Sequence, residues 1–244
     1  MQFKPFEKMT VLEVVVFCLM AVCSGVMVGI GGVSSLLASV WLGDWGRLVG
    51  AVLFSLGIFT IVTYEMRLFT GMVAEIPQMG VKNYWKLPVC FLFNAVGVGI
   101  VALLAHYSPV GDLILGRSQS LISAKLSASD WALRALCSSI LCGILITVSV
   151  RCRSYTQKKG VSSTLGVTFP IVVFAFCGFD HSVANMLHFF YLGQCTWQIV
   201  GYILVSILGN IIGGVAFPMI TRLRRYIDCE RAKRANEEPN CIDD

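Results

Sequence analysis

The stretch Cys177-Gly178-Phe179-Asp180-His181-Ser182-Val183-Ala184-Asn185 lies between two apolar runs of a 244-residue chain. A second polar stretch, Tyr64-Glu65-Met66-Arg67-Leu68-Phe69-Thr70-Gly71, divides an earlier apolar run in the same way. Each contains a glycine and hydrogen-bonding side chains between hydrophobic flanks. Matched interruptions of this kind indicate an inverted repeat whose functional site lies at the middle of a membrane.

The composition points to a lipid environment for the rest of the chain. Hydrophobic residues make up 56% of the sequence and charged residues 14%, whereas a soluble domain carries about 25% charged residues. The net charge is +5, but the basic residues gather at the edges of the apolar runs. This placement is typical of orientation signals in a membrane protein and not of a nucleic-acid-binding surface.

The apolar runs predict an all-α membrane protein with six transmembrane helices, because about 20 helical residues cross a hydrocarbon layer. Barrel strands are excluded because the runs are too long for them. The predicted spans are 11–41, 48–76, 85–107, 131–150, 161–190 and 196–221. The second and fifth spans contain the interruptions. We therefore expect one transmembrane channel domain, 1–221, with aquaporin-like inverted repeats at about 1–107 and 125–221, followed by a polar tail, 222–244.

The basic residues predict the orientation of the chain. They concentrate in the N-terminal segment, in the loops after the second and fourth spans, and in the tail: Lys4, Lys8, Lys82, Lys86, Arg151, Arg153, Lys158, Lys159, Arg222, Arg224 and Arg225. Because positive loops stay in the cytoplasm, we expect a multi-pass protein of a bacterial inner membrane with both termini cytoplasmic.

His181 is the most informative residue, because an ionisable group inside a membrane span is costly and usually faces a cavity or a partner. An imidazole there can give a hydrogen bond or a proton to a passing anion; the alternative is a neutral histidine that satisfies the broken backbone.

Thr70 offers a hydroxyl at the other interruption, where free backbone N–H groups favour anions; the alternative is a simple kink. Lys125, in the loop before the fourth span, would raise the local anion concentration, unless it is merely solvated.

No catalytic arrangement is present in the sequence. It contains no nucleophile motif, no His-Glu-x-x-His and no phosphate-binding glycine loop. We therefore expect neither an enzyme nor a cofactor or metal site.

Leu68-Phe69-Thr70-Gly71 and the run from Gly178 to Met186 resemble the two loop signatures of the formate/nitrite transporter family. The glycine-rich runs Gly25–Gly32 and Gly209–Gly214 also resemble that family. The resemblance covers the chain except its tail. It implies an aquaporin-like fold, a homopentamer with one pore in each protomer, and a small anion as substrate.

The resemblance also implies roles for single residues. His181 would be the central pore histidine, Thr70 its polar neighbour, Asn185 the residue that orders the second loop, and Lys125 a vestibule lysine. The remaining implied residues are those of two apolar constrictions: Leu68, Phe69 and Ile58 on the cytoplasmic side, and Phe54 and Phe174 on the outer side.

Two departures from the family pattern bear on the substrate. Arg67 stands where formate and nitrite members usually carry glutamate, and Gly143 stands where they usually carry asparagine. Both resemble the hydrosulfide-channel branch, so we expect hydrosulfide, with formate or nitrite as alternatives. A water or small-neutral-solute channel would normally show Asn-Pro-Ala at both interruptions, and neither has it. A coupled secondary transporter and a receptor without flux are further alternatives.

Overall fold

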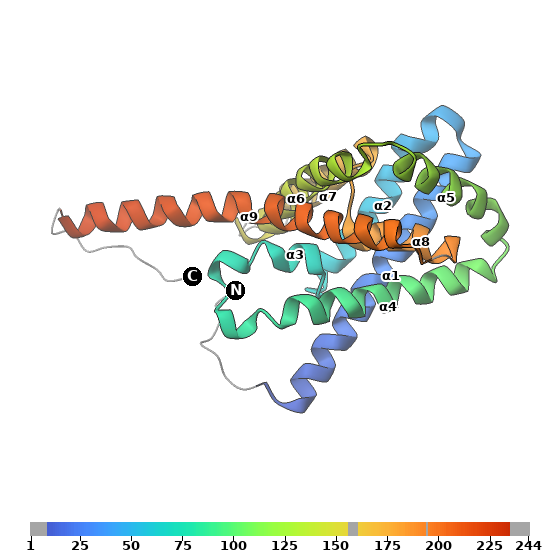
Figure 1. Ribbon diagram of the computed structural model, residues 1–244. Helices are drawn as coiled ribbons and strands as arrows, with labels where there is room; N and C mark the ends of the chain where they lie inside the picture. Colours follow the sequence, from blue (N-terminus) through green and yellow to red (C-terminus); the bar gives the residue numbers. More distant parts are fainter. Residues whose placement is uncertain (1–8, 156–160, 194, 235–244) are drawn as a thin grey trace.

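The computed structural model describes residues 9–155, 161–193 and 195–234, and within these ranges the chain is helical with no β-strand (Figure 1). Short 3-10 turns precede α2 and lie between α3 and α4. The α-helices are α1 Val11–Trp41, α2 Gly46–Thr63, α3 Phe69–Val73, α4 Lys86–His106, α5 Gly111–Leu126, α6 Trp131–Tyr155, α7 Val161–Cys177, α8 Ser182–Leu192 and α9 Trp197–Arg234.

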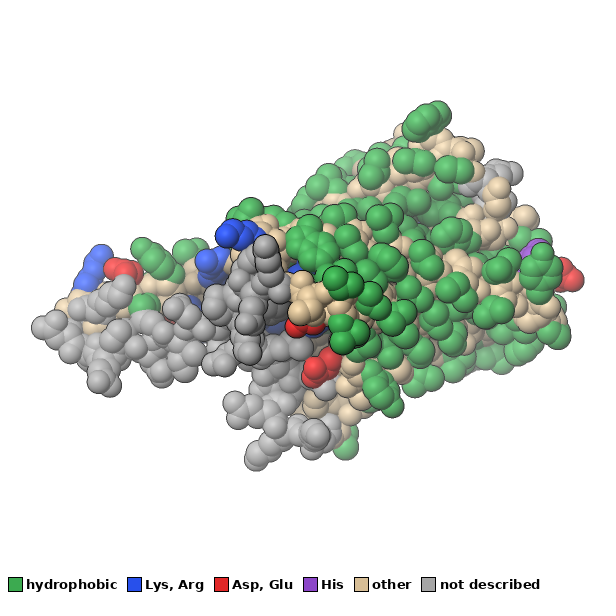
Figure 2. All heavy atoms as spheres, turned by 90° about the horizontal axis from the view of Figure 1, so that it is seen from below, with side chains coloured by type: hydrophobic (Ala, Val, Ile, Leu, Met, Phe, Trp, Pro, Cys, Tyr) green, Lys and Arg blue, Asp and Glu red, His purple; other side chains and the backbone are tan. Residues whose placement is uncertain are grey.

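The described residues contain five helical segments that are long and apolar enough to cross a membrane, and α7 with α8, bent by 47° at a short break, makes a sixth. These segments lie at the predicted positions. Figure 2 shows hydrophobic side chains over the broad body of the molecule, while charged side chains gather where α9 projects. An apolar surface this extensive requires a lipid environment.

The helices stop at both polar interruptions. Helix α2 ends at Thr63, and the chain runs without helix through residues 64–68 before the short α3. Helix α7 ends at Cys177, and α8 begins at Ser182. Gly178, directly after α7, has a φ of +74°, a conformation that glycine adopts without the penalty a Cβ would bring.

Glycines allow the long helices to pack closely in two pairs, α1 with α4 and α6 with α9. A Cβ at Gly97 of α4 would collide with the carbonyl oxygen of Val22 in α1. A Cβ at Gly213 of α9 would collide in the same way with the carbonyl oxygen of Ile140 in α6. The small residues therefore bring the backbones of each pair into contact, as is common between membrane helices.

We expect Gly97→Ala to lower the melting temperature of the detergent-purified protein. The new methyl group would overpack the α1–α4 contact, which costs about 1–3 kcal/mol. The matched control is Gly116→Ala in α5, because a Cβ at Gly116 meets no atom within 4 Å. Alanine favours a helix over glycine by roughly 0.5–1 kcal/mol, so this control should not be destabilised. Equal melting temperatures for the two variants would contradict the packing argument.

The segment between the third and fourth spans was predicted to be a loop, but it forms the helix α5. Ile114, Ser118 and Ile122 are buried, and their spacing of one helical turn gives α5 a single inward face. Polar residues between these positions make the helical spacing of this short face difficult to recognise in the sequence. Helix α5 lies at the end of the molecule opposite to the projecting part of α9 (Figure 1). We call these two ends the α5 end and the α9 end.

Helix α9 continues past the predicted end of the sixth span to Arg234. Its last turns project from the body (Figure 1) and are largely exposed. Close to where it leaves the body, Arg222 donates a hydrogen bond to the carbonyl oxygen of Pro77. Most of the tail that is described is therefore a helical extension of the last span.

Candidate functional site

The two helix breaks meet at a hydrogen bond between Thr70 and His181. Thr70 Oγ1 lies 2.9 Å from His181 Nε2, and the side chains are 2% and 1% exposed. His181 is also the N-cap of α8, where its Nδ1 accepts a hydrogen bond from the Ala184 N–H at 3.0 Å. An accepting Nδ1 leaves the proton of a neutral imidazole on Nε2. His181 thus directs an N–H donor toward Thr70.

Apolar side chains surround this polar contact. The Phe174 ring stacks on the His181 ring, with centroids 5.9 Å apart, and Phe54 meets Phe174 edge-on at 5.6 Å. Ile58 of α2 and Leu68 of the first break are buried. The structure therefore brings Phe54 and Phe174, the residues expected in the outer constriction, into contact with each other and next to the imidazole.

Phe69, the residue after Leu68, packs against a neighbouring helix. Its ring contacts Phe91 of α4, with centroids 5.2 Å apart. Its backbone N–H donates to Asn94 Oδ1 at 2.8 Å. The structure thus places the Phe69 ring against α4, where it anchors the start of α3.

Asp180, next to His181, is the centre of a buried group of side chains. Its Oδ1 atom accepts hydrogen bonds from Lys125 Nζ at 2.5 Å, Tyr202 Oη at 2.6 Å and Asn185 Nδ2 at 3.0 Å. Lys125 Nζ also donates to Asn185 Oδ1 at 3.0 Å. We call these four residues the Asp180 cluster. Lys125 is ion-paired with Asp180 here, so its positive charge is largely balanced.

A second histidine, His188, helps to position the helix that carries Lys125. His188 Nδ1 lies 2.9 Å from Ser118 Oγ, which joins α8 to α5, the helix that carries Lys125. The sequence had suggested no role for His188. The structure gives it a positioning role between two helices.

Tyr202 is a site residue that the sequence analysis missed. It is 2% exposed and stacks on Trp131 with ring centroids 6.0 Å apart. A buried tyrosine usually has a hydrogen-bond partner for its hydroxyl, so a tyrosine within an apolar run was an available signal. Its partner, Asp180, could be identified only from the fold.

Asn94 of α4 holds the first break. Its Nδ2 donates to the carbonyl oxygens of Ala21 in α1, at 2.7 Å, and Arg67, at 2.9 Å. Its Oδ1 accepts from the Phe69 N–H. One buried amide thus satisfies backbone groups that the break leaves without helical partners, as a membrane interior requires.

Asn210 of α9 does the same at the second break. Its Nδ2 donates to the carbonyl oxygens of Ser139 in α6, at 2.8 Å, and Asp180, at 2.9 Å. Its Oδ1 accepts from the Ser182 N–H at 2.9 Å. The pattern repeats that of Asn94. Each amide binds its own break and also the backbone of one other long helix, which is α1 for Asn94 and α6 for Asn210.

Arginines at the ends of the molecule cap further backbone groups. Arg47 donates to the carbonyl oxygens of Phe176 and Cys177 at the end of α7, at 2.5 and 3.0 Å. Arg151 donates to the carbonyl oxygen of Ala74, after α3, at 3.0 Å. Cations at such carbonyl ends are stabilising. Arg151, which the sequence analysis assigned to orientation alone, also has this local role.

Among the described residues, no group of three or more His, Cys, Asp and Glu side chains could hold a metal ion. Six spans with two breaks that meet at a buried histidine define a multi-pass helical membrane protein with a site in its interior. A family model for the formate/nitrite transporter matches residues 5–223. The chain belongs to the formate/nitrite transporter family, which confirms the resemblance seen in the sequence.

Known proteins agree with this assignment. The formate channel BtFdhC of Bacillus thuringiensis is 28% identical over 211 residues, which cover 79% of this chain and 78% of the relative. A solved FNT family ion channel superposes with a TM-score of 0.74 at 23% identity, covering 87% of this chain and 91% of the other. A solved pentameric formate channel with formate bound gives 0.72 at 20% identity, covering 87% and 97%. The protein thus has the fold of a family of channels and transporters, not of enzymes.

Proposed function

We propose that the protein is a channel for small monovalent anions of weak acids, with hydrosulfide as its preferred anion. The observation that carries the proposal is the buried hydrogen bond between Thr70 and His181, which joins two helix breaks inside an apolar surrounding. It supports a narrow passage between Thr70 and His181, in which an ion could replace Thr70 as the acceptor of the His181 Nε2–H group.

The matched asparagines support an inverted repeat of residues 1–107 and 125–221. Asn94 and Asn210 bind their breaks in the same register and occupy corresponding long helices. Gly25 and Gly143 also correspond, since a Cβ at either would collide with the carbonyl oxygen of the respective asparagine. Two such halves in opposite orientations would place both breaks at the same membrane depth.

The mechanism follows from the cost of moving a charge into an apolar passage, which is many kcal/mol for a bare ion. At the Asp180 cluster an anion meets the Lys125 ammonium group. At His181 it replaces Thr70 as the acceptor of the Nε2–H hydrogen bond and, with a proton that arrives from the aqueous solution as hydronium, becomes the neutral acid. The neutral acid crosses the constriction formed by Leu68, Phe69 and Ile58 on one side and Phe54 and Phe174 on the other, and it returns the proton to water at the far end.

The choice of hydrosulfide rests on Arg67. The other departure from the family pattern, Gly143, has a packing role, because its missing side chain lets α6 approach α9 at Asn210. Formate is the second candidate, since the relative BtFdhC is named a formate channel.

Reconstitution into liposomes tests the proposal directly. We expect hydrosulfide, formate and nitrite to cross faster than in protein-free liposomes, with hydrosulfide the fastest of the three. Chloride, whose acid is strong, should be slower by at least about tenfold, because it cannot cross as a neutral acid and an extra barrier of 1.4 kcal/mol already gives that factor. Chloride flux equal to formate flux, or osmotic swelling with water as the main permeant, would refute an anion channel of this kind.

The assembly and orientation complete the proposal. We expect a homopentamer, as in the pentameric formate channel of similar fold, in a bacterial inner membrane. The α9 end carries Lys82, Lys86, Arg151 and Arg222, which supports a cytoplasmic position for this end and for both termini. Native mass spectrometry of the purified protein measures the subunit number, and reporter fusions at each terminus measure the orientation.

A further inference from the structure

Three buried hydroxyl groups at the second helix break have no hydrogen-bond partner among the described residues. They belong to Ser139 of α6, Ser182 at the start of α8 and Ser206 of α9, and each of these residues is at most 1% exposed. Other buried serines, such as Ser24 and Ser55, donate to a carbonyl oxygen about one turn earlier in their own helix. Buried polar groups are normally satisfied by protein or by ordered water, so the three hydroxyls point to a further ligand.

The three serines gather around one side chain, that of Asn210. Its Nδ2 group donates to the Ser139 carbonyl oxygen at 2.8 Å, and its Oδ1 atom accepts from the Ser182 N–H at 2.9 Å. Ser206 lies one helical turn before Asn210 on α9. The Ser139 side chain faces α9, since a Cβ at Gly209 would lie only 2.6 Å from the Ser139 Cβ. The hydroxyls therefore belong to one small region between α6, α8 and α9.

The first break has no hydroxyl at the corresponding places. The contacts of Asn94 identify two of these places as Ala21 and Phe69. Cys90, one turn before Asn94, corresponds to Ser206. Its thiol has a partner, because it donates to a carbonyl oxygen of the first break at 3.3 Å. The scaffold that the two halves share thus needs none of the three serine hydroxyls.

The same comparison favours space for a ligand at the second break. In the first break the ring of Phe69 packs on Phe91 of α4. In the same register, Ser182 and Ile207 stand at these two positions of the second break. Smaller side chains thus occupy the places at which the first break has two aromatic rings.

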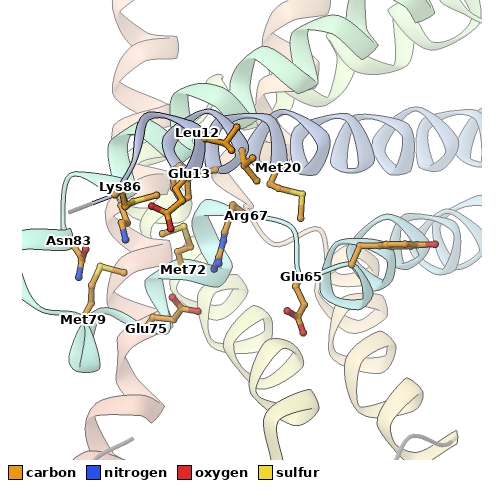
Figure 3. A pocket seen from close by; sticks show the side chains of 14 residues that line it. Leu12, Glu13, Met20, Glu65, Arg67, Met72, Glu75, Met79, Asn83 and Lys86 are labelled. Atoms are coloured by element: carbon orange, nitrogen blue, oxygen red, sulfur yellow. The ribbon is translucent and has the colours of Figure 1, made fainter. Parts of the chain in front are cut away.

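The two breaks also differ in their access to solvent. The first borders a cavity of about 510 Å³ at the α9 end, lined among others by Arg67 and by the exposed Glu13 and Glu65 (Figure 3). Polar groups there can be hydrated directly from the solution. The three serines do not line this cavity and are buried, so water that satisfies them has to be an ordered part of the structure.

We propose that Ser139, Ser182 and Ser206 together bind an ordered water molecule beside the second break. A water molecule both donates and accepts, as a serine hydroxyl does, and a buried one makes about three hydrogen bonds. The three hydroxyls are neutral, which favours water over an ion in a buried place. The bound water joins the start of α8 to α6 and α9. The inference goes beyond the proposed function and does not depend on it.

Ser206→Ala tests the site through the melting temperature of the detergent-purified protein. Loss of a water-bound hydroxyl should lower this temperature by about 2–4 °C, the shift expected for one ordinary hydrogen bond in a chain of this size. An unpartnered hydroxyl predicts the opposite sign, because removing an unsatisfied buried group is stabilising. Ser24→Ala is the matched control, since the buried Ser24 hydroxyl donates to the Met20 carbonyl oxygen within α1. It should shift the melting temperature by less than half as much.

The double variant Ser139→Ala/Ser206→Ala tests whether the hydroxyls share one ligand. Sharing predicts a combined loss smaller than the sum of the two single losses, because the first substitution already weakens the hold on the water. A higher melting temperature in the single variants, or strictly additive losses, would overturn the inference.

A cryo-electron microscopy map of the wild-type protein that resolves ordered water provides a test without any substitution. We expect a density peak within hydrogen-bonding distance of the Oγ atoms of Ser139, Ser182 and Ser206. A map that shows ordered water elsewhere in the protein interior and none at these three atoms would also overturn the inference.

Discussion

Replacing His181 by alanine is expected to abolish most of the discrimination between formate and chloride in liposomes. The variant loses the Nε2–H donor at the level of Thr70, and a hydrogen bond to a charged partner contributes about 1.5–3 kcal/mol. The ratio of formate to chloride flux should therefore fall roughly 10- to 100-fold. The dependence of formate flux on pH should flatten in the same experiment.

Two further variants separate the pore role of His181 from its structural role. His181→Asn removes the imidazole but keeps a side chain that caps helices well, so it should lose discrimination while its melting temperature stays near that of the wild type. His188→Ala removes the other histidine of α8, whose partner is Ser118, and should keep discrimination. If His181→Ala conducted with the wild-type anion preference and pH dependence, the role assigned to His181 would be wrong.

Replacing Lys125 by methionine is expected to give the largest loss of stability of the variants considered. It leaves the Asp180 carboxylate, whose side chain is 6% exposed, without its cation. Removing one partner of a buried ion pair typically costs about 3–5 kcal/mol. The melting temperature of the purified protein and the yield of intact oligomer should both fall.

The double variant Lys125→Met/Asp180→Asn provides the test of this cause. It leaves no buried charge, while Tyr202 and Asn185 keep a polar partner at position 180, so most of the lost stability should return. Lys86→Met, which removes a cation that has no ion pair among the described residues, should be destabilised less than Lys125→Met. Strictly additive effects of the two single changes at positions 125 and 180 would show that the ion pair is not the cause.

The spans and the position of the breaks could be predicted from the sequence because the bilayer restricts the solutions so strongly. Within hydrocarbon the chain must be helical, so a polar, glycine-containing interruption such as the one around His181 stands out. The place of Thr70 beside His181 was implied by the resemblance of the two interruptions to the family's loop signatures, which are short sequence motifs. These are local patterns whose meaning does not depend on which other segments lie nearby.

The side-chain partners could not be predicted in this way. The partners of Asp180 come from α5, α8 and α9, and Tyr202 in particular joins it only because α9 packs beside the second break. Helix α5 escaped prediction because it has a single inward face of four buried residues, of which only Ile114 and Ile122 are large and apolar. The ring of Phe69 was expected in the constriction, and its contact with Phe91 depends on how α3 docks against α4. Each of these features is decided by packing between distant segments.

The amides of Asn94 and Asn210 limit how such a conduit can open and close. Each ties a break to two long helices through three hydrogen bonds, and leaving one buried group unsatisfied costs about 1–3 kcal/mol. Sliding or straightening either break would therefore cost more than the rotation of a few side chains. We therefore expect the backbone around His181 to stay fixed. Any gate would then act by rotation of side chains or by movement of parts of the chain outside the two breaks.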